Sequence, residues 1–177
     1  MRKGRVWGLV LFALLLFALD ATTKYFTFAH ISRSSYGSFS YPYGGIGVFQ
    51  DFLGIDFSIN LVMNKGGAWG VFSSIPKVLL SVRIGIILAL AVYTFFINPL
   101  KKRTFPFLLI IIGALANIID VFIYGAVVDM FHFVLWGYSY PVFNVADMLI
   151  FFGVAILIMQ IISEKLKKDR INATESP

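Results

Sequence analysis

Four apolar runs, each long enough to cross a lipid bilayer as a helix, constrain this 177-residue chain more than any other feature. They lie at about residues 6–28, 78–97, 105–124 and 145–162. A helical span of the hydrocarbon core takes about 20 apolar residues. The chain is 59% hydrophobic and 14% charged, and a soluble globule of this size could not bury so much apolar surface. The sequence predicts a membrane all-α protein, a single membrane domain over residues 1–177 with four transmembrane helices.

Clusters of basic residues predict how the spans are oriented. Ten of the 15 Lys and Arg residues lie before the first span, between the second and third, or after the fourth. Because Lys and Arg concentrate in cytoplasmic loops, we expect both termini in the cytoplasm and the loops 29–77 and 125–144 outside it. The net charge of +6 is then a topology signal that also favours anionic membrane lipids as partners. No motif for nucleic-acid binding accompanies it.

The first outer loop differs from the spans in composition, being rich in Gly, Ser, Tyr and Phe. The segment from Tyr41 to Gly45 is typical of a turn, and aromatic and β-branched residues from Phe52 to Met63 predict one or two short strands. We therefore expect a small β-rich extracytoplasmic subdomain, about residues 29–77, between the first and second helices. Its aromatic side chains suit the membrane–water interface.

Four acidic side chains lie in or beside the spans, and the expected topology places all of them toward the outer side. They are Asp20, Asp120, Asp129 and Asp147. An Asp costs about 2.5–3.5 kcal/mol at the centre of a span and less near its end, so this convergence is informative.

Two of these carboxyls, Asp20 and Asp120, have a structural explanation. Asp20 and Lys24 are four residues apart and can pair on one helix face, an interpretation slightly favoured for this pair alone. Asn117 and Asp120 suit hydrogen bonding between helices.

Helix capping explains the pair at the start of the fourth span, where Asn144 suits the N-cap and Asp147 the helix dipole. Asp129 is left without such an explanation, and no Lys or Arg lies between Asp120 and Asp147 to neutralise these groups. Two carboxyls in a low-dielectric site share a proton, and such a pair activates water in aspartic proteases. A non-proteolytic proton or cation path uses intramembrane carboxyls too, and stays open as an alternative.

Other chemistries lack their motifs. The chain has no cysteine, which excludes disulfides, thiol nucleophiles and Cys-zinc sites. It has no His-Glu-x-x-His helix of a metalloprotease and no Gly-x-Ser-x-Gly nucleophile elbow. We therefore expect no metal and no other cofactor.

Five short segments follow one another from the first span to the last. They are Asp20-Ala21-Thr22-Thr23-Lys24, Asn64-Lys65-Gly66-Gly67-Ala68-Trp69, Gly113-Ala114-Leu115-Ala116-Asn117-Ile118-Ile119-Asp120, Val127-Val128-Asp129-Met130 and Phe143-Asn144-Val145-Ala146-Asp147. In this order they resemble the motifs of the lipoprotein signal peptidase (signal peptidase II) family. Each motif alone is weak, whereas five in order are specific.

The resemblance implies an intramembrane aspartic endopeptidase, multi-pass in the bacterial inner membrane, with its active site near the outer, periplasmic leaflet. Its substrates would be diacylglyceryl-modified prolipoproteins, which it would cut before the lipidated cysteine. The cyclic peptide globomycin would be an inhibitor, and we expect a monomer. An inactive homologue that only binds prolipoproteins is a further alternative.

Matching the motifs residue by residue gives the candidate site. The catalytic residues implied are Asp129 and Asp147. The residues expected to bind substrate or position the site are Asn64, Gly66, Asn117, Asn144 and Ala146. The supporting residues are Asp20, Lys24 and Asp120. The family usually has Arg directly after the Asp of the third span, where this chain has Val121, so Asp120 lacks an obvious counterion unless Lys24 or Lys65 reaches it.

Overall fold

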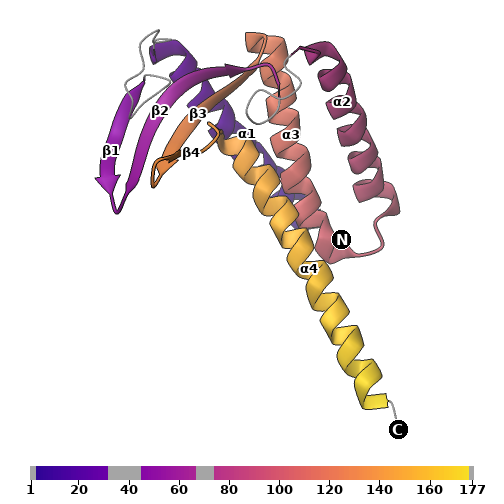
Figure 1. The fold of residues 1–177 in the computed structure, drawn as a ribbon. Helices are drawn as coiled ribbons and strands as arrows, with labels where there is room; N and C mark the ends of the chain where they lie inside the picture. The colour runs from indigo at the N-terminus through magenta and orange to yellow at the C-terminus, as the bar shows by residue number, and fades with distance from the viewer. Residues whose placement is uncertain (1–2, 32–44, 67–73, 176–177) are drawn as a thin grey trace.

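Four long helices run alternately in opposite directions in the computed structural model, which describes residues 3–31, 45–66 and 74–175 (Figure 1). They are α1 (Lys3–His30), α2 (Pro76–Val92), α3 (Thr104–Tyr124) and α4 (Val145–Glu175). With the π-helical turn η2 (Tyr93–Ile97) counted into α2, all four are long and apolar enough to cross a membrane. The helices match the four predicted spans, except that α4 runs on past residue 162.

Local sequence sets several helix ends. Pro76 occupies the first turn of α2, where its missing N–H costs no hydrogen bond. Gly125 ends α3 in the left-handed conformation, with φ of 77°, and its N–H donates to the carbonyl of Val121 at 3.1 Å. The 3₁₀ turn η3 (Lys101–Arg103) leads into α3.

A four-stranded antiparallel sheet in the order β1-β2-β3-β4 lies at the end of the helices away from the C-terminal end of α4 (Figure 1). Its strands are β1 (Ile46–Phe52), β2 (Ile55–Asn64), β3 (Val127–Leu135) and β4 (Tyr138–Ser139). Each hairpin turns through two residues with positive φ, Leu53-Gly54 and Trp136-Gly137, as a two-residue type I′ turn requires.

The sheet corrects the prediction of a β-rich insertion confined between the first two helices. Only β1 and β2 come from the loop 29–77, whereas β3 and β4 come from the loop between α3 and α4. Strand β3 lacks the alternation of apolar and polar residues that marks a half-buried strand, because its first four residues are all buried. The predicted turn at 41–45 lies, apart from Gly45, outside the described residues, as does the 67–69 part of the second motif.

Small residues bring α3 and α4 close together. A Cβ atom on Gly113 would overlap the carbonyl oxygen of Ala146, and one on Gly153 would lie 2.7 Å from the carbonyl oxygen of Pro106. Close backbone approach through small residues is the usual way that helices associate in a membrane. This packing places the start of α4 beside the middle of α3.

Candidate active site

Lys24 forms the centre of a buried cluster at the end of the helices next to the sheet. Its Nζ lies 2.7 Å from Oδ2 of Asp20 and 2.7 Å from Oδ2 of Asp120, and it donates to Oδ1 of Asn117 at 2.8 Å. The side chain is 0% exposed, and these three acceptors match the three N–H donors of an ammonium group. Lys24 is therefore the counterion of Asp120, and the predicted Asp20–Lys24 ion pair forms as part of a larger cluster.

The two carboxylates that hold Lys24 also fix the chain around it. Asp20 Oδ1 accepts the backbone N–H of Ala146 at 2.7 Å, which ties α1 to the first turn of α4. Asp120 Oδ2 accepts the backbone N–H of Val128 at 3.2 Å, which ties α3 to the start of β3. Both carboxylates thus position segments that carry other predicted site residues.

The start of α4 has the reciprocal cap that its sequence predicted. The N–H of Asp147 donates to Oδ1 of Asn144 at 2.9 Å, and the N–H of Asn144 donates to Oδ2 of Asp147 at 3.2 Å. The remaining oxygen of Asp147, Oδ1, accepts the side-chain amide of Asn117 at 2.8 Å. Capping therefore fixes the position of Asp147, and its carboxylate lies beside the side-chain amide of Asn117.

Asp129 lies in β3, not in a loop, and is 2% exposed. Its Oδ2 accepts the side-chain amide of Asn64 at 2.9 Å, and its Oδ1 accepts that of Asn144 at 2.7 Å. Burial, and next the negative charge of Asp147, raise the pKa of Asp129 from 3.8 to about 7 against the lowering effect of these hydrogen bonds and of Lys24. The pKa of the Asp129 carboxyl therefore lies near neutral pH, well above that of an ordinary aspartate.

Both carboxylates face one cavity of about 280 Å³. The residues that line it are Asn64, Gly66, Arg83, Asn117, Val127, Asp129, Tyr140, Pro141, Val142, Phe143 and Asp147. Asn144 contacts both carboxylates, while Ala146, Asp20, Lys24 and Asp120 form the support described above. All ten predicted site residues thus converge on one region built from α1, β2, α3, β3 and α4.

Arg83 and Tyr140 also line the cavity, and neither is among the predicted site residues. Arg83 lies within the second apolar run, and a charged residue inside a span marks a functional position just as an intramembrane Asp does. Tyr140 carried no such signal, because it is one of eight tyrosines and belongs to none of the five motifs.

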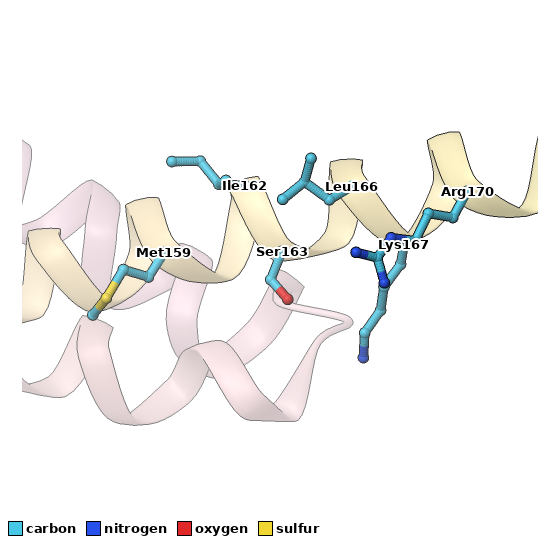
Figure 2. Close-up of a pocket in the computed structure, with 6 residues that line it drawn as sticks. All are labelled: Met159, Ile162, Ser163, Leu166, Lys167 and Arg170. Carbon is cyan, nitrogen blue, oxygen red and sulfur yellow. The ribbon is translucent and has the colours of Figure 1, made fainter.

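Two further hollows lie along α4. One of about 260 Å³ shares Tyr140, Phe143 and Asp147 with the cavity and is otherwise apolar, lined by Met148, Phe151 and Phe152. The other, of about 370 Å³, is drawn in Figure 2, and its lining side chains all come from residues 159–170 of α4: Met159, Ile162, Ser163, Leu166, Lys167 and Arg170. None of the predicted site residues lines this second hollow, so the chemistry-bearing side chains belong to the cavity near the sheet.

Relatives match the chain over most of its length. The sequence model of a family described as Signal peptidase (SPase) II matches residues 12–163. A lipoprotein signal peptidase of Clostridium tetani is 36% identical over 155 residues, 86% of this chain and 90% of that protein. One of Campylobacter jejuni is 30% identical over 164 residues, 92% of this chain and 90% of that protein. A match to that of Chlamydia pneumoniae, 38% identical over 104 residues, spans 58% of this chain and 62% of that protein, less than two thirds of it.

Two solved structures of bacterial membrane enzymes have a similar fold. The first has a TM-score of 0.71 and 26% identity, covering 97% of this chain and 94% of its own. The second has a TM-score of 0.68 and 26% identity, covering 88% of this chain and 93% of its own. Because the family's sequence model covers most of the chain and its relatives align nearly end to end, this multi-pass membrane protein belongs to the signal peptidase II family of lipoprotein signal peptidases.

Proposed function

We propose that the protein is an intramembrane aspartic endopeptidase that removes the signal peptide from diacylglyceryl-modified prolipoproteins, cutting before the lipidated cysteine. The observation that carries this proposal is the pair Asp129 and Asp147, whose carboxylates line one cavity and are each held by asparagine side chains. Membership of the signal peptidase II family supports the substrate class.

The reaction needs one ionised and one protonated carboxyl around a water molecule. The ionised carboxylate takes a proton from the water, which attacks the scissile carbonyl, while the protonated carboxyl donates a hydrogen bond to the carbonyl oxygen. A pKa of about 7 for Asp129 suits this arrangement, because the pair Asp129–Asp147 then shares a single proton near neutral pH. We assign the proton to the pair and not to either residue alone.

The asparagines hold the two carboxyls in place. The side-chain amide of Asn144 donates to Asp129, and the backbone N–H of Asn144 donates to Asp147, so one residue links both carboxyls. Asn117 donates to Asp147 while its oxygen accepts from Lys24, so the charged cluster supports the same geometry. Side chains that are fixed in this way cost little reorganisation when the reaction occurs.

The surroundings of Asp147 fit a substrate that carries acyl chains. The apolar groove of Met148, Phe151 and Phe152 runs along α4 from the cavity, and these side chains are exposed on the helix surface, where lipid tails lie in a membrane. A diacylglyceryl cysteine enters from the bilayer, so the site opens toward lipid. Globomycin, an amphipathic cyclic peptide, is the expected inhibitor of the same cavity.

We place the protein in the bacterial inner membrane as a monomer, with both termini cytoplasmic and the sheet on the periplasmic surface. The turn η3 and the polar end of α4 lie at the opposite end of the helices from the sheet (Figure 1), and they carry basic clusters. The positive-inside rule then puts the cavity near the outer leaflet.

A proton or cation path is less well supported, because such a path needs polar groups across the membrane. Residues 105–116 of α3 and 148–158 of α4 contain no charged residue and no Ser, Thr, Asn, Gln, His or Tyr. The described polar groups of these helices gather at their ends, where they line a cavity or form ion pairs.

The test is cleavage of a diacylglyceryl-modified precursor by the purified protein in lipid bilayers, read by mass spectrometry of both products. We expect release of the intact signal peptide and a new N-terminus at the lipidated cysteine, with no cleavage of the unlipidated precursor. Failure of the folded protein to cleave either precursor would overturn the proposal, and proton flux across sealed vesicles would then favour the path.

A further inference from the structure

Arg83 is the side chain that α2 contributes to the cavity, and it is the one positive charge among the described residues that line it. The ion pairs of the described residues do not include it, and its Nη2 instead donates to the carbonyl oxygen of Gly66 at 2.8 Å. An arginine inside a membrane span costs free energy, and such residues usually have a role in the fold or in function. Here the hydrogen bond from Arg83 to Gly66 leads, through two further hydrogen bonds, to a carboxyl of the proposed catalytic pair.

A continuous chain of hydrogen bonds runs from Arg83 to Asp129. Arg83 holds the carbonyl of Gly66, the N–H of Gly66 donates to Oδ1 of Asn64 at 2.9 Å, and Nδ2 of Asn64 donates to Oδ2 of Asp129 at 2.9 Å. The bond from Gly66 fixes which end of the Asn64 amide faces Asp129. A flipped amide would point its oxygen at the carboxyl and lose the donor.

We propose, on the basis of the proposed function above, that Arg83 is a positioning residue: it fixes the Asn64–Gly66 turn so that Asn64 donates to Asp129. Arg83 is the last polar side chain along α2, since residues 84–92 are all apolar or Gly, and Ile87 is the one buried residue of the helix. The guanidinium group of Arg83 reaches this turn from α2, 17 residues further along the chain than Gly66. Among the described residues, the Gly66 N–H is the hydrogen-bond donor to the side-chain oxygen of Asn64 at the end of β2.

The charged groups that act on Asp129 come from several elements. Asp147 of α4 raises its pKa, Lys24 of α1 lowers it, and the hydrogen bond from Asn64 lowers it as well. Asp120 of α3 reaches the neighbouring Val128 N–H, and Arg83 of α2 acts through Gly66. Because the Asn64 hydrogen bond favours the ionised form, its loss raises the pKa of Asp129.

The test is a double-mutant cycle of Arg83→Met and Asn64→Ala, with Arg83→Lys as the conservative variant and Val82→Met as a neighbouring control on the exposed face of α2. We expect each single variant to lower kcat by up to about 10²-fold, with a smaller change in KM, because the carboxyl is misplaced rather than the substrate lost. The double variant should be no worse than the poorer single one. Arg83→Lys should recover part of the rate, since an ammonium still donates to the Gly66 carbonyl, and Val82→Met should match the wild type.

A second readout does not depend on cleavage. The titration midpoint of the Asp129 carboxyl, followed by carbon NMR of labelled aspartate with Asp129→Asn for assignment, should move to higher pH in both Arg83→Met and Asn64→Ala. Losses of kcat that multiply in the double variant would overturn the positioning role. A titration midpoint that moves in Asn64→Ala but not in Arg83→Met would overturn it too. Wild-type protein that titrates as described but cleaves no precursor would overturn the proposed function and leave the positioning role standing.

Discussion

The two ends of the α3–α4 pair both carry ion pairs, and they differ in burial and in surroundings. At the end next to the sheet, Lys24 is completely buried between Asp20 and Asp120 and lies against the wall of the cavity. At the other end, Glu164 pairs with two basic residues of η3, and its side chain is 33% exposed. The first cluster is shielded from water, whereas water can reach the second cluster.

Because the two ion-pair clusters differ in burial, their charges have different roles. Glu164 forms ion pairs with Lys102 at 2.8 Å and Arg103 at 2.7 Å, which join η3 to α4 at the surface. Exposed pairs of this kind contribute little to stability and are screened by salt. Lys24 instead neutralises Asp20 and Asp120, and its removal would leave these two buried carboxylates without a counterion.

The largest expected effect is on cleavage, from Asp129→Asn or Asp147→Asn at the buried end. Either change removes a carboxyl that the reaction needs to give or take a proton, and should lower the single-turnover rate by at least about 10²-fold. Both variants should keep the wild-type thermal midpoint within a few degrees, since an amide has nearly the same shape. Near-wild-type cleavage by either one would show that the pair is not the catalyst.

A large effect on stability is expected from Lys24→Met. Breaking a buried ion pair by removing one partner costs about 3–5 kcal/mol, so the thermal midpoint in detergent should fall markedly and activity with it. The triple variant Asp20→Asn/Lys24→Met/Asp120→Asn should regain part of that stability, because no uncompensated charge remains. A Lys24→Met protein as stable as the triple variant would contradict the role given to Lys24.

The smallest effect is expected from Glu164→Gln, the matched change at the exposed end. It likewise removes the central charge of an ion-pair cluster, here a negative one that water reaches, so the thermal midpoint should move by no more than about 2 °C and the cleavage rate should stay unchanged. Raising the salt concentration should reduce even this difference. A fall in the thermal midpoint as large as that of Lys24→Met would contradict the difference between the two ends.

The four apolar helices and the cap of α4 could be predicted from the sequence, because each rests on a local pattern. Asn144 and Asp147 are three residues apart at a helix start, and the cap they predict is confirmed. The apolar runs alone indicated the four helices. Such signals need no knowledge of which segments lie side by side.

What the sequence did not predict depends on pairing between distant segments. Strand β3 completes a sheet that begins in the loop between α1 and α2, and the register of that pairing places Val62 opposite Asp129. Lys24 serves Asp20 on its own helix but also Asp120 on another, a contact that spacing along one helix cannot reveal. Arg83 reaches Gly66 from a separate helix for the same reason.

The pH dependence of cleavage tests the account most directly, because it reports the shared proton of Asp129 and Asp147. Asp129 has a pKa of about 7, so the rate should fall as the pH rises through that value and the proton is lost, and it should fall again at low pH when both carboxyls are protonated. We predict this bell-shaped profile of kcat/KM for the wild type and no measurable activity for Asp129→Asn at any pH. A rate that is flat between about pH 5 and pH 9, or an active Asp129→Asn protein with the same profile, would contradict the account.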